Sequence, residues 1–155
     1  MGILTEDMQS TVREQRLGYM ATVCPDGTPN LSPKGTIRVW DDDHLVFGEI
    51  CSPGTMENLA HNPTIEINVC DTFLRKGYRF KGTAEVLTEG NQFEKIMELY
   101  LGTASQPGIG SQIRSIVLIT VQRALPVVSP GYSPGISESQ MKAQWKDYYV
   151  SLAQP

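Results

Sequence analysis

The sequence has few of the residues that build metal sites or disulfide frameworks. Its 155 residues include three cysteines and two histidines, and no CxxC pair occurs. Zinc sites and disulfide scaffolds need more such residues at closer spacing, so we expect neither here. The widely spaced thiols of Cys24, Cys51 and Cys70 are typical of unpaired cysteines in a reducing cytoplasm.

Long apolar runs and an excess of positive charge are also missing. No run approaches the ~20 apolar residues of a membrane-spanning helix, and the polar segment 1–16 is not typical of a signal peptide. The net charge of −4 disfavours nucleic-acid binding, although it leaves room for a local cationic pocket. With 40% apolar and 19% charged residues, residues 1–155 have the composition of one globular domain.

One predicted strand carries a row of hydroxyl groups and cations. It follows the β-prone residues Thr22–Cys24 and a turn at 25–28. Side chains alternate along a strand, so one face would carry Leu31, Pro33, Gly35, Ile37 and Val39, and the other Ser32, Lys34, Thr36 and Arg38. Pro33 and Gly35 suit a bulge or sheet edge with backbone open to a ligand. On spacing alone, the polar row also suits a solvated outer face.

Hydrophobic patterns predict a mainly β fold with small helices. Strands are expected at 17–24, 31–39, 44–50, 64–70, 78–87 and 113–121. Helices are expected within 1–16 and at 52–61, 91–101 and 137–152. The apolar run 116–119 predicts a last strand covered by barrel interior on one face and by a partner on the other, before an extended loop at 126–135. Six or seven hairpin-linked strands favour a closed antiparallel barrel.

A helix start at 52–55 offers a candidate anion site. Ser52 or Thr55 would serve as N-cap, and Pro53 fits the first turn. The free N–H groups and dipole of a helix N-terminus favour negative charge. A plain helix cap is the alternative interpretation.

Four segments occur in a specific order: GYMATVCPDGTPNLSPKGTIRV, DDDHLVFGE, SPGTMENLAHNP and GYRFKGTAEV. Together they resemble the pyridoxamine 5′-phosphate oxidase-like family of FMN-binding proteins, over roughly residues 17–128. The resemblance implies a mainly β, six- to seven-stranded antiparallel split barrel with accessory helices. It also implies a homodimer that holds FMN at the subunit interface.

Matched position by position, the resemblance implies a flavin site with several parts. Along the flavin ring and ribityl chain would lie Ser32, Pro33, Lys34, Gly35 and Thr36. The stretch from Glu49 to Ser52 would follow the ribityl chain and phosphate, with Thr55 and Asn58 beside the phosphate. Arg79 and Lys81 lie on a strand that reaches toward this site in relatives. A phosphate of about two charges needs such cations and N–H donors.

Two departures from the family pattern bear on which cation would bind the phosphate and on which substrate is expected. Many relatives carry Arg or Lys where this chain has Gly54, so the phosphate would need Lys34, Arg79 or Lys81. After Arg123 the chain has no Arg or His, which argues against pyridoxamine phosphate as substrate. We expect an FMN-dependent oxidoreductase that uses a small-molecule substrate or electron donor, with no metal and no catalytic side chain. The alternatives are a flavin carrier or electron-transfer module without turnover, and a barrel that binds F420 or haem.

Overall fold

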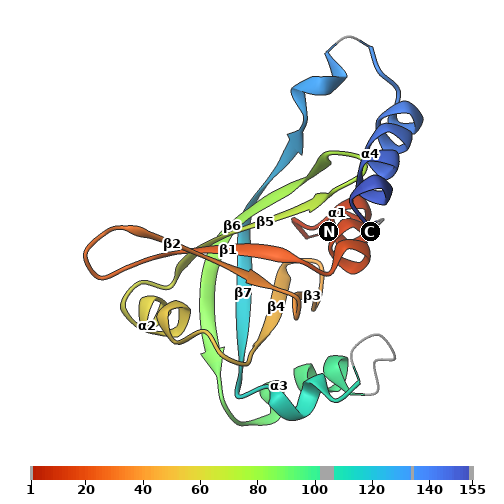
Figure 1. Cartoon of the computed structure of the whole chain (residues 1–155). Coiled ribbons are helices and arrows are strands. Elements are labelled where there is room, and N and C mark those ends of the chain that lie inside the picture. The colour runs from red at the N-terminus through yellow and green to blue at the C-terminus, as the bar shows by residue number, and fades with distance from the viewer. Residues whose placement is uncertain (1, 102–106, 134, 154–155) are drawn as a thin grey trace.

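A seven-stranded antiparallel sheet forms the body of the protein in the computed structural model, which describes residues 2–101, 107–133 and 135–153 (Figure 1). The strands are β1 (Gly18–Val23), β2 (Pro29–Lys34), β3 (Arg38–Val39), β4 (His44–Glu49), β5 (Thr64–Asp71), β6 (Lys76–Leu87) and β7 (Ser115–Val128). Their order in the sheet is β2-β1-β5-β6-β7-β4-β3.

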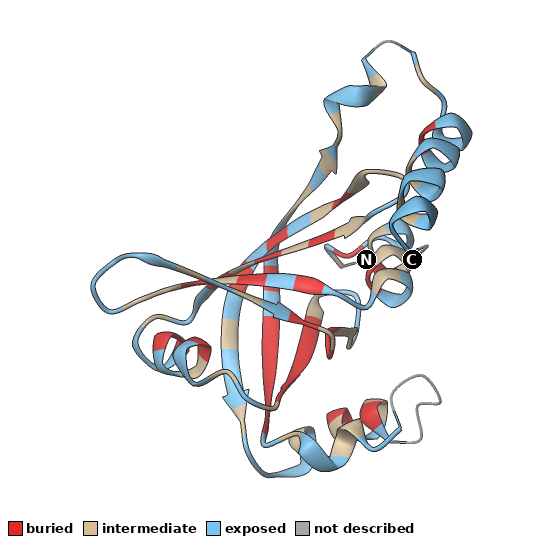
Figure 2. Ribbon diagram, viewed as in Figure 1, coloured by how far each residue is buried: buried red, intermediate tan, exposed pale blue. Residues whose placement is uncertain are grey.

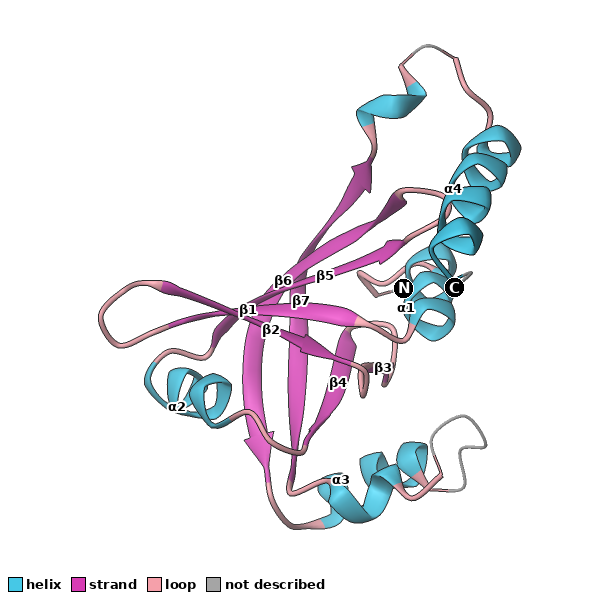
Figure 3. Ribbon diagram, in the orientation of Figure 1, coloured by secondary structure: helices cyan, strands magenta, loops and turns pink. Residues whose placement is uncertain are grey.

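The expected helices are present beside the sheet (Figure 3). The α-helices are α1 (Glu6–Gln15), α2 (Pro53–His61), α3 (Asn91–Met97) and α4 (Glu138–Ala153). Short 3-10 helices are η1 (Glu98–Tyr100), η2 (Ile109–Gln112) and η3 (Pro130–Tyr132). In the part of the chain that the structure describes, no helix has both the length and the apolar character needed to cross a membrane.

The sheet curls into a split barrel, and strand pairing does not close it. The edge strands β2 and β3 are joined by residues 35–37, and neither pairs with the other in the strand order. This corrects the closed barrel expected from the strand pattern and agrees with the split barrel that the resemblance implied. The β6–β7 register shifts between Lys81 and Gly82, which marks a β-bulge. A Cβ at Gly82 would lie 2.2 Å from the Thr120 carbonyl oxygen, so the bulge requires glycine.

Two apolar clusters lie on opposite sides of β4 and β7 (Figure 2). The larger fills the barrel and includes Phe47 and Ile119. The smaller includes Ile116 and Tyr100 and is covered by α3 and η1. The double burial of the last strand is therefore confirmed, but its second cover is the chain's own helical segment rather than a partner. This strand also continues through Pro126 to Val128, three residues into the predicted loop.

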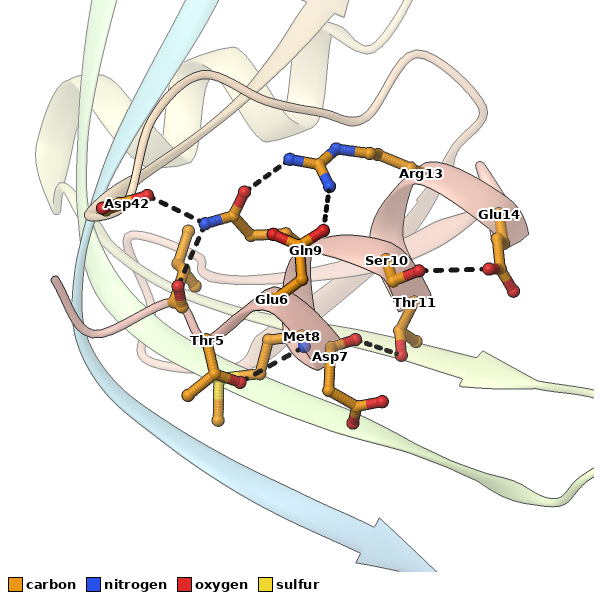
Figure 4. Close-up of polar contacts among 11 residues, drawn as sticks. Thr5, Glu6, Asp7, Met8, Gln9, Ser10, Thr11, Arg13, Glu14 and Asp42 are labelled. Atoms are coloured by element: carbon orange, nitrogen blue, oxygen red, sulfur yellow. Dashed lines mark hydrogen bonds and ion pairs between the residues drawn. The ribbon is translucent and has the colours of Figure 1, made fainter. Parts of the chain in front are cut away.

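The N-terminal helix α1 begins at a side-chain cap and is fastened to the acidic β3–β4 turn (Figure 4). Thr5 Oγ1 accepts a hydrogen bond from the Met8 N–H. Gln9 is buried, and its Nε2 donates to the Leu4 carbonyl and to Asp42 Oδ1, both at 3.0 Å. The Asp42 carbonyl in turn accepts from the Leu4 N–H at 2.8 Å. The acidic turn thus holds the N-terminal segment against the sheet.

The polar row of β2 faces the interior of the sheet and is not the solvated outer face that its spacing also allowed. Ser32 and Lys34 point to the inner side, opposite Met20 and Gly18 of β1, and Lys34 is only 9% exposed. Leu31 on the outer side is 65% exposed. The predicted strand also breaks at residues 35–37, so Arg38 belongs to β3. The alternation was correct up to this break, but the polar row belongs to the interior rather than to an outer solvated face.

Candidate functional site

A pocket of about 240 Å³ opens where β2 ends beside the last residues of β4. It is lined by Pro33, Lys34, Gly35, Thr36, Gly48, Ile50, Cys51 and Ser52. Seven of these residues were expected at the cofactor site from the sequence: Pro33, Lys34, Gly35 and Thr36 of the strand, and Ile50, Cys51 and Ser52 of the stretch from Glu49 to Ser52. Larger pockets of about 420 Å³ and 310 Å³ lie elsewhere on the sheet, but they hold fewer of the expected residues.

Lys34 is the buried cation of this pocket. Its Nζ donates to Ser32 Oγ at 2.6 Å and lies 5.9 Å from the centroid of the Phe47 ring. Burial lowers the pKa of the Lys34 ammonium, and the negative charge of Glu49 opposes part of that shift. Among the described residues, no carboxylate lies within ion-pair distance of Lys34. The ammonium group therefore keeps unused capacity to pair with an anion.

The two walls of the pocket are joined by side-chain hydrogen bonds. Thr36 is buried, and its Oγ1 donates to the Gly48 carbonyl of β4 at 2.6 Å. Glu49 is 6% exposed and accepts from the Ser52 N–H at 2.6 Å and from the Ser52 hydroxyl at 3.2 Å. Ser52 occupies the N-cap position of α2 but makes no capping bond with its side chain. Its hydroxyl instead donates to Glu49 and so holds the connection between β4 and α2.

Helix α2 carries two further predicted residues, Thr55 and Asn58, on its buried side. Asn58 Nδ2 donates to Thr22 Oγ1 at 2.9 Å, which fastens the helix to β1. Thr55, in the first turn of α2, is 2% exposed, and its Oγ1 makes no hydrogen bond to any other residue that the structure describes. A buried hydroxyl without a partner is uncommon, and a ligand that donates or accepts there would satisfy it.

Arg79 and Lys81 lie on the outer face of the sheet. Both are exposed, and both pair with Glu66 of β5. The distances are 2.5 Å from Arg79 Nε to Glu66 Oε1 and 3.3 Å from Lys81 Nζ to Glu66 Oε2. Lys81 also lines the 310 Å³ pocket, away from residues 33–36. Within one chain, the structure therefore does not bring these cations together with Lys34.

One pocket residue, Gly48, lies outside the segments predicted to form the site. Gly48 contributes a wall, and a Cβ there would lie 2.4 Å from the Ile113 side chain. Cys51 also lines the pocket and is exposed. The described residues hold no group of three or more His, Cys, Asp or Glu side chains placed to bind a metal ion.

Comparison with known proteins identifies the family. The model of the pyridoxamine 5′-phosphate oxidase family matches residues 4–127, so the chain belongs to this family. An uncharacterized protein of Methanocaldococcus jannaschii is 30% identical over 97 residues, which cover 61% of this chain and 63% of that protein.

Solved structures share the fold. HupZ of Group A Streptococcus is 34% identical, with a TM-score of 0.71 over 81% of this chain and 94% of HupZ. An FMN-binding protein of Syntrophomonas wolfei subsp. wolfei is 19% identical, with a TM-score of 0.65 over 81% of this chain and 87% of that protein. At this identity the second likeness concerns the fold alone. The split barrel and the family expected from the sequence are both confirmed.

Proposed function

We propose that the protein binds FMN in the pocket between β2 and the β4–α2 segment and acts as an oxidoreductase. The observation that carries the proposal is the buried Lys34 ammonium, which lines this pocket and has no carboxylate partner among the described residues. Burying a cation without a counter-charge is costly, and a bound anion would remove much of that cost. The FMN-binding relative of the same fold supports the choice of anion.

The residues present fit the two ends of FMN. Thr55 Oγ1 and the first N–H groups of α2 would hold the phosphate, because a helix N-terminus favours anions. Lys34 would supply positive charge to the phosphate, and the 35–36 backbone would lie along the ring and ribityl chain. FMN supplies electron-transfer chemistry through its own ring, so the chain needs to bind it, orient it and exclude water. Arg79 and Lys81 stay candidates for the phosphate, although Glu66 already pairs with both.

A homodimer is part of the same proposal. The outer face of β1 and β2 exposes large apolar side chains, with Leu17 at 43%, Tyr19 at 44% and Leu31 at 65% exposure. A contiguous exposed apolar face is typical of a protein interface. We infer that a second copy covers this face. Light scattering of the purified protein should then give twice the mass of the 17.1 kDa chain.

Flavin titration tests the proposal directly. Adding the protein to FMN should quench flavin fluorescence and shift its absorption bands. Riboflavin, which lacks the phosphate, should bind more weakly, because it cannot use the first turn of α2 or its Thr55 hydroxyl. A protein that leaves both spectra unchanged would contradict FMN binding. If FMN binds but neither NADH nor NADPH reduces it, a carrier or electron-transfer role replaces turnover with these donors.

A further inference from the structure

The turn that forms one wall of the pocket has all of its carbonyl groups occupied by side chains. Residues 35–37 connect β2 to β3. Arg38 Nη1 donates to the Gly35 carbonyl at 3.3 Å and to the Ile37 carbonyl at 2.7 Å. The Tyr100 hydroxyl donates to the Thr36 carbonyl at 2.8 Å, across 64 residues of sequence. Three consecutive carbonyls are thus fixed by two side chains.

The Thr36 N–H of the same turn has no such partner among the residues that the structure describes. Across a trans peptide, an N–H points opposite to the carbonyl of the preceding residue. The Thr36 N–H therefore points away from Arg38, whose Nη1 donates to the Gly35 carbonyl. This N–H donates to no other described residue, although Thr36 is only 5% exposed, whereas the Ile37 N–H closes the turn at 35–36. Buried N–H groups are normally paired, and an unpaired one costs about 1–3 kcal/mol.

The two side chains that hold the turn are anchored outside the pocket. Tyr100 is 2% exposed and belongs to the smaller apolar cluster under α3 and η1. Burial raises the pKa of Tyr100, so its hydroxyl stays protonated and keeps donating. The Arg38 guanidinium lies 5.4 Å from the Tyr100 ring centroid, a cation–π geometry that orients it toward the turn. Neither residue lines the pocket.

We propose that Arg38 and Tyr100 are positioning residues for the cofactor. They hold the 35–37 carbonyls by hydrogen bonds from outside the pocket and thereby present the Thr36 N–H to an acceptor atom of the flavin. This role rests on the proposed FMN function. It gives the helical segment that ends at Tyr100 a part in cofactor binding, although no residue of that segment lines the pocket.

A pair of matched variants tests the proposal. Tyr100→Phe removes one hydroxyl that donates to a carbonyl, and Tyr132→Phe removes another, since Tyr132 donates to the Leu74 carbonyl at 2.6 Å. Tyr100→Phe should weaken FMN roughly threefold to tenfold, the scale of one hydrogen bond. Riboflavin should weaken by the same factor, because the lost bond serves the part of the flavin that both ligands share. Tyr132→Phe should leave both dissociation constants unchanged.

Nuclear magnetic resonance of the flavin-free protein separates this role from the proposed function. Tyr100→Phe should shift the amide resonances of residues 35–37 and leave those of residues 18–23 in place. If wild type binds no FMN, the proposed function fails and so does the cofactor role of this turn. If wild type binds FMN but Tyr100→Phe binds it equally well, or Tyr132→Phe loses as much affinity, the positioning role alone is overturned. Arg38→Lys, which keeps the charge but loses the planar fork, should weaken FMN in the same direction.

Discussion

Two sets of cations in this molecule have opposite surroundings. Lys34 is 9% exposed, and its Nζ donates to one neutral hydroxyl. Arg79 and Lys81 have side chains 46% and 49% exposed, and both pair with the Glu66 carboxylate. The exposed pairs follow the ordinary chemistry of a protein surface. The buried ammonium does not, because a charge taken out of water normally brings its own counter-charge.

This difference between the cations indicates that Lys34, rather than Arg79 or Lys81, can bind an anion most favourably. A carboxylate that is already in place reduces what a phosphate would gain from the same cation. Lys34 has only a hydroxyl, so an anion in the pocket would supply its counter-charge. Burial of Lys34 thus lowers the stability of the ligand-free protein and increases the affinity for a ligand.

Replacing the two kinds of lysine should give the largest contrast. Lys34→Met keeps most of the side-chain volume and removes the charge. We expect it to weaken FMN by roughly 1–3 kcal/mol, the scale of a lost charge-assisted hydrogen bond. The flavin-free variant should be as stable as wild type or more stable, because a buried charge is removed. Fluorescence titration and urea unfolding measure the two effects.

Lys81→Met is the matched control for that experiment. It removes an exposed ammonium whose partner is Glu66, so FMN affinity should stay close to the wild-type value. Equal losses of affinity in the two variants would abolish the distinction between buried and exposed cations. A gain in stability without any loss of affinity in Lys34→Met would remove Lys34 from the site.

Two threonines allow the same comparison with hydroxyl groups. Thr55→Val removes a buried hydroxyl that has no partner among the described residues, whereas Thr22→Val removes one that accepts from Asn58 and Asn30. We expect Thr55→Val to weaken FMN by about 0.5–1.5 kcal/mol without destabilising the flavin-free protein. Thr22→Val should destabilise the flavin-free protein by about 1–3 kcal/mol, because it removes the hydroxyl oxygen to which the buried Asn58 amide and the half-buried Asn30 amide donate.

Two results would contradict this expectation for Thr55→Val. If Thr55→Val destabilises the flavin-free protein as much as Thr22→Val does, the Thr55 hydroxyl has a structural partner and no free capacity. If it leaves FMN affinity unchanged but weakens riboflavin, the first turn of α2 does not serve the phosphate. Titrations with both flavins, beside thermal unfolding of each variant, decide this.

Local patterns in the sequence predicted most of the fold. Period-two alternation located β6, and helical spacing located α3 and α4. Seven residues of the predicted site line one pocket because they are near neighbours in two segments that the resemblance had already paired. Spacing alone left open whether the polar row of β2 is solvated. The structure buries Lys34, whereas Leu31 and Pro33 lie on the exposed side of this edge strand.

Long-range contacts account for what the sequence did not predict. The bond from Tyr100 to Thr36 joins positions 64 residues apart, and Asn58 reaches Thr22 across 36. No local spacing predicts such pairs, because they depend on how the sheet curls. The pairing of Glu66 with Arg79 and Lys81 likewise follows from the β5–β6 register, which places Glu66 opposite Lys81. A sequence pattern shows three charged residues, and only the register shows that they satisfy one another.

Glu66→Gln gives the smallest effect and bears most directly on the outer cations. The hydrogen bond from Arg79 holds the pKa of Glu66 below its ordinary value of 4.5, with a further contribution from Lys81. A carboxylate whose folded-state pKa is depressed adds stability above its unfolded pKa, and that stability is lost as the pH falls through the folded value.

Because the pair is partly exposed, Glu66→Gln should cost less than about 1 kcal/mol at pH 7 in urea unfolding. The difference from wild type should begin to shrink as the pH falls below 4.5 and should vanish only below the depressed pKa of the folded state. FMN affinity should not change. If it rises instead, releasing Arg79 and Lys81 has supplied charge to the phosphate, and the outer cations belong to the site beside Lys34.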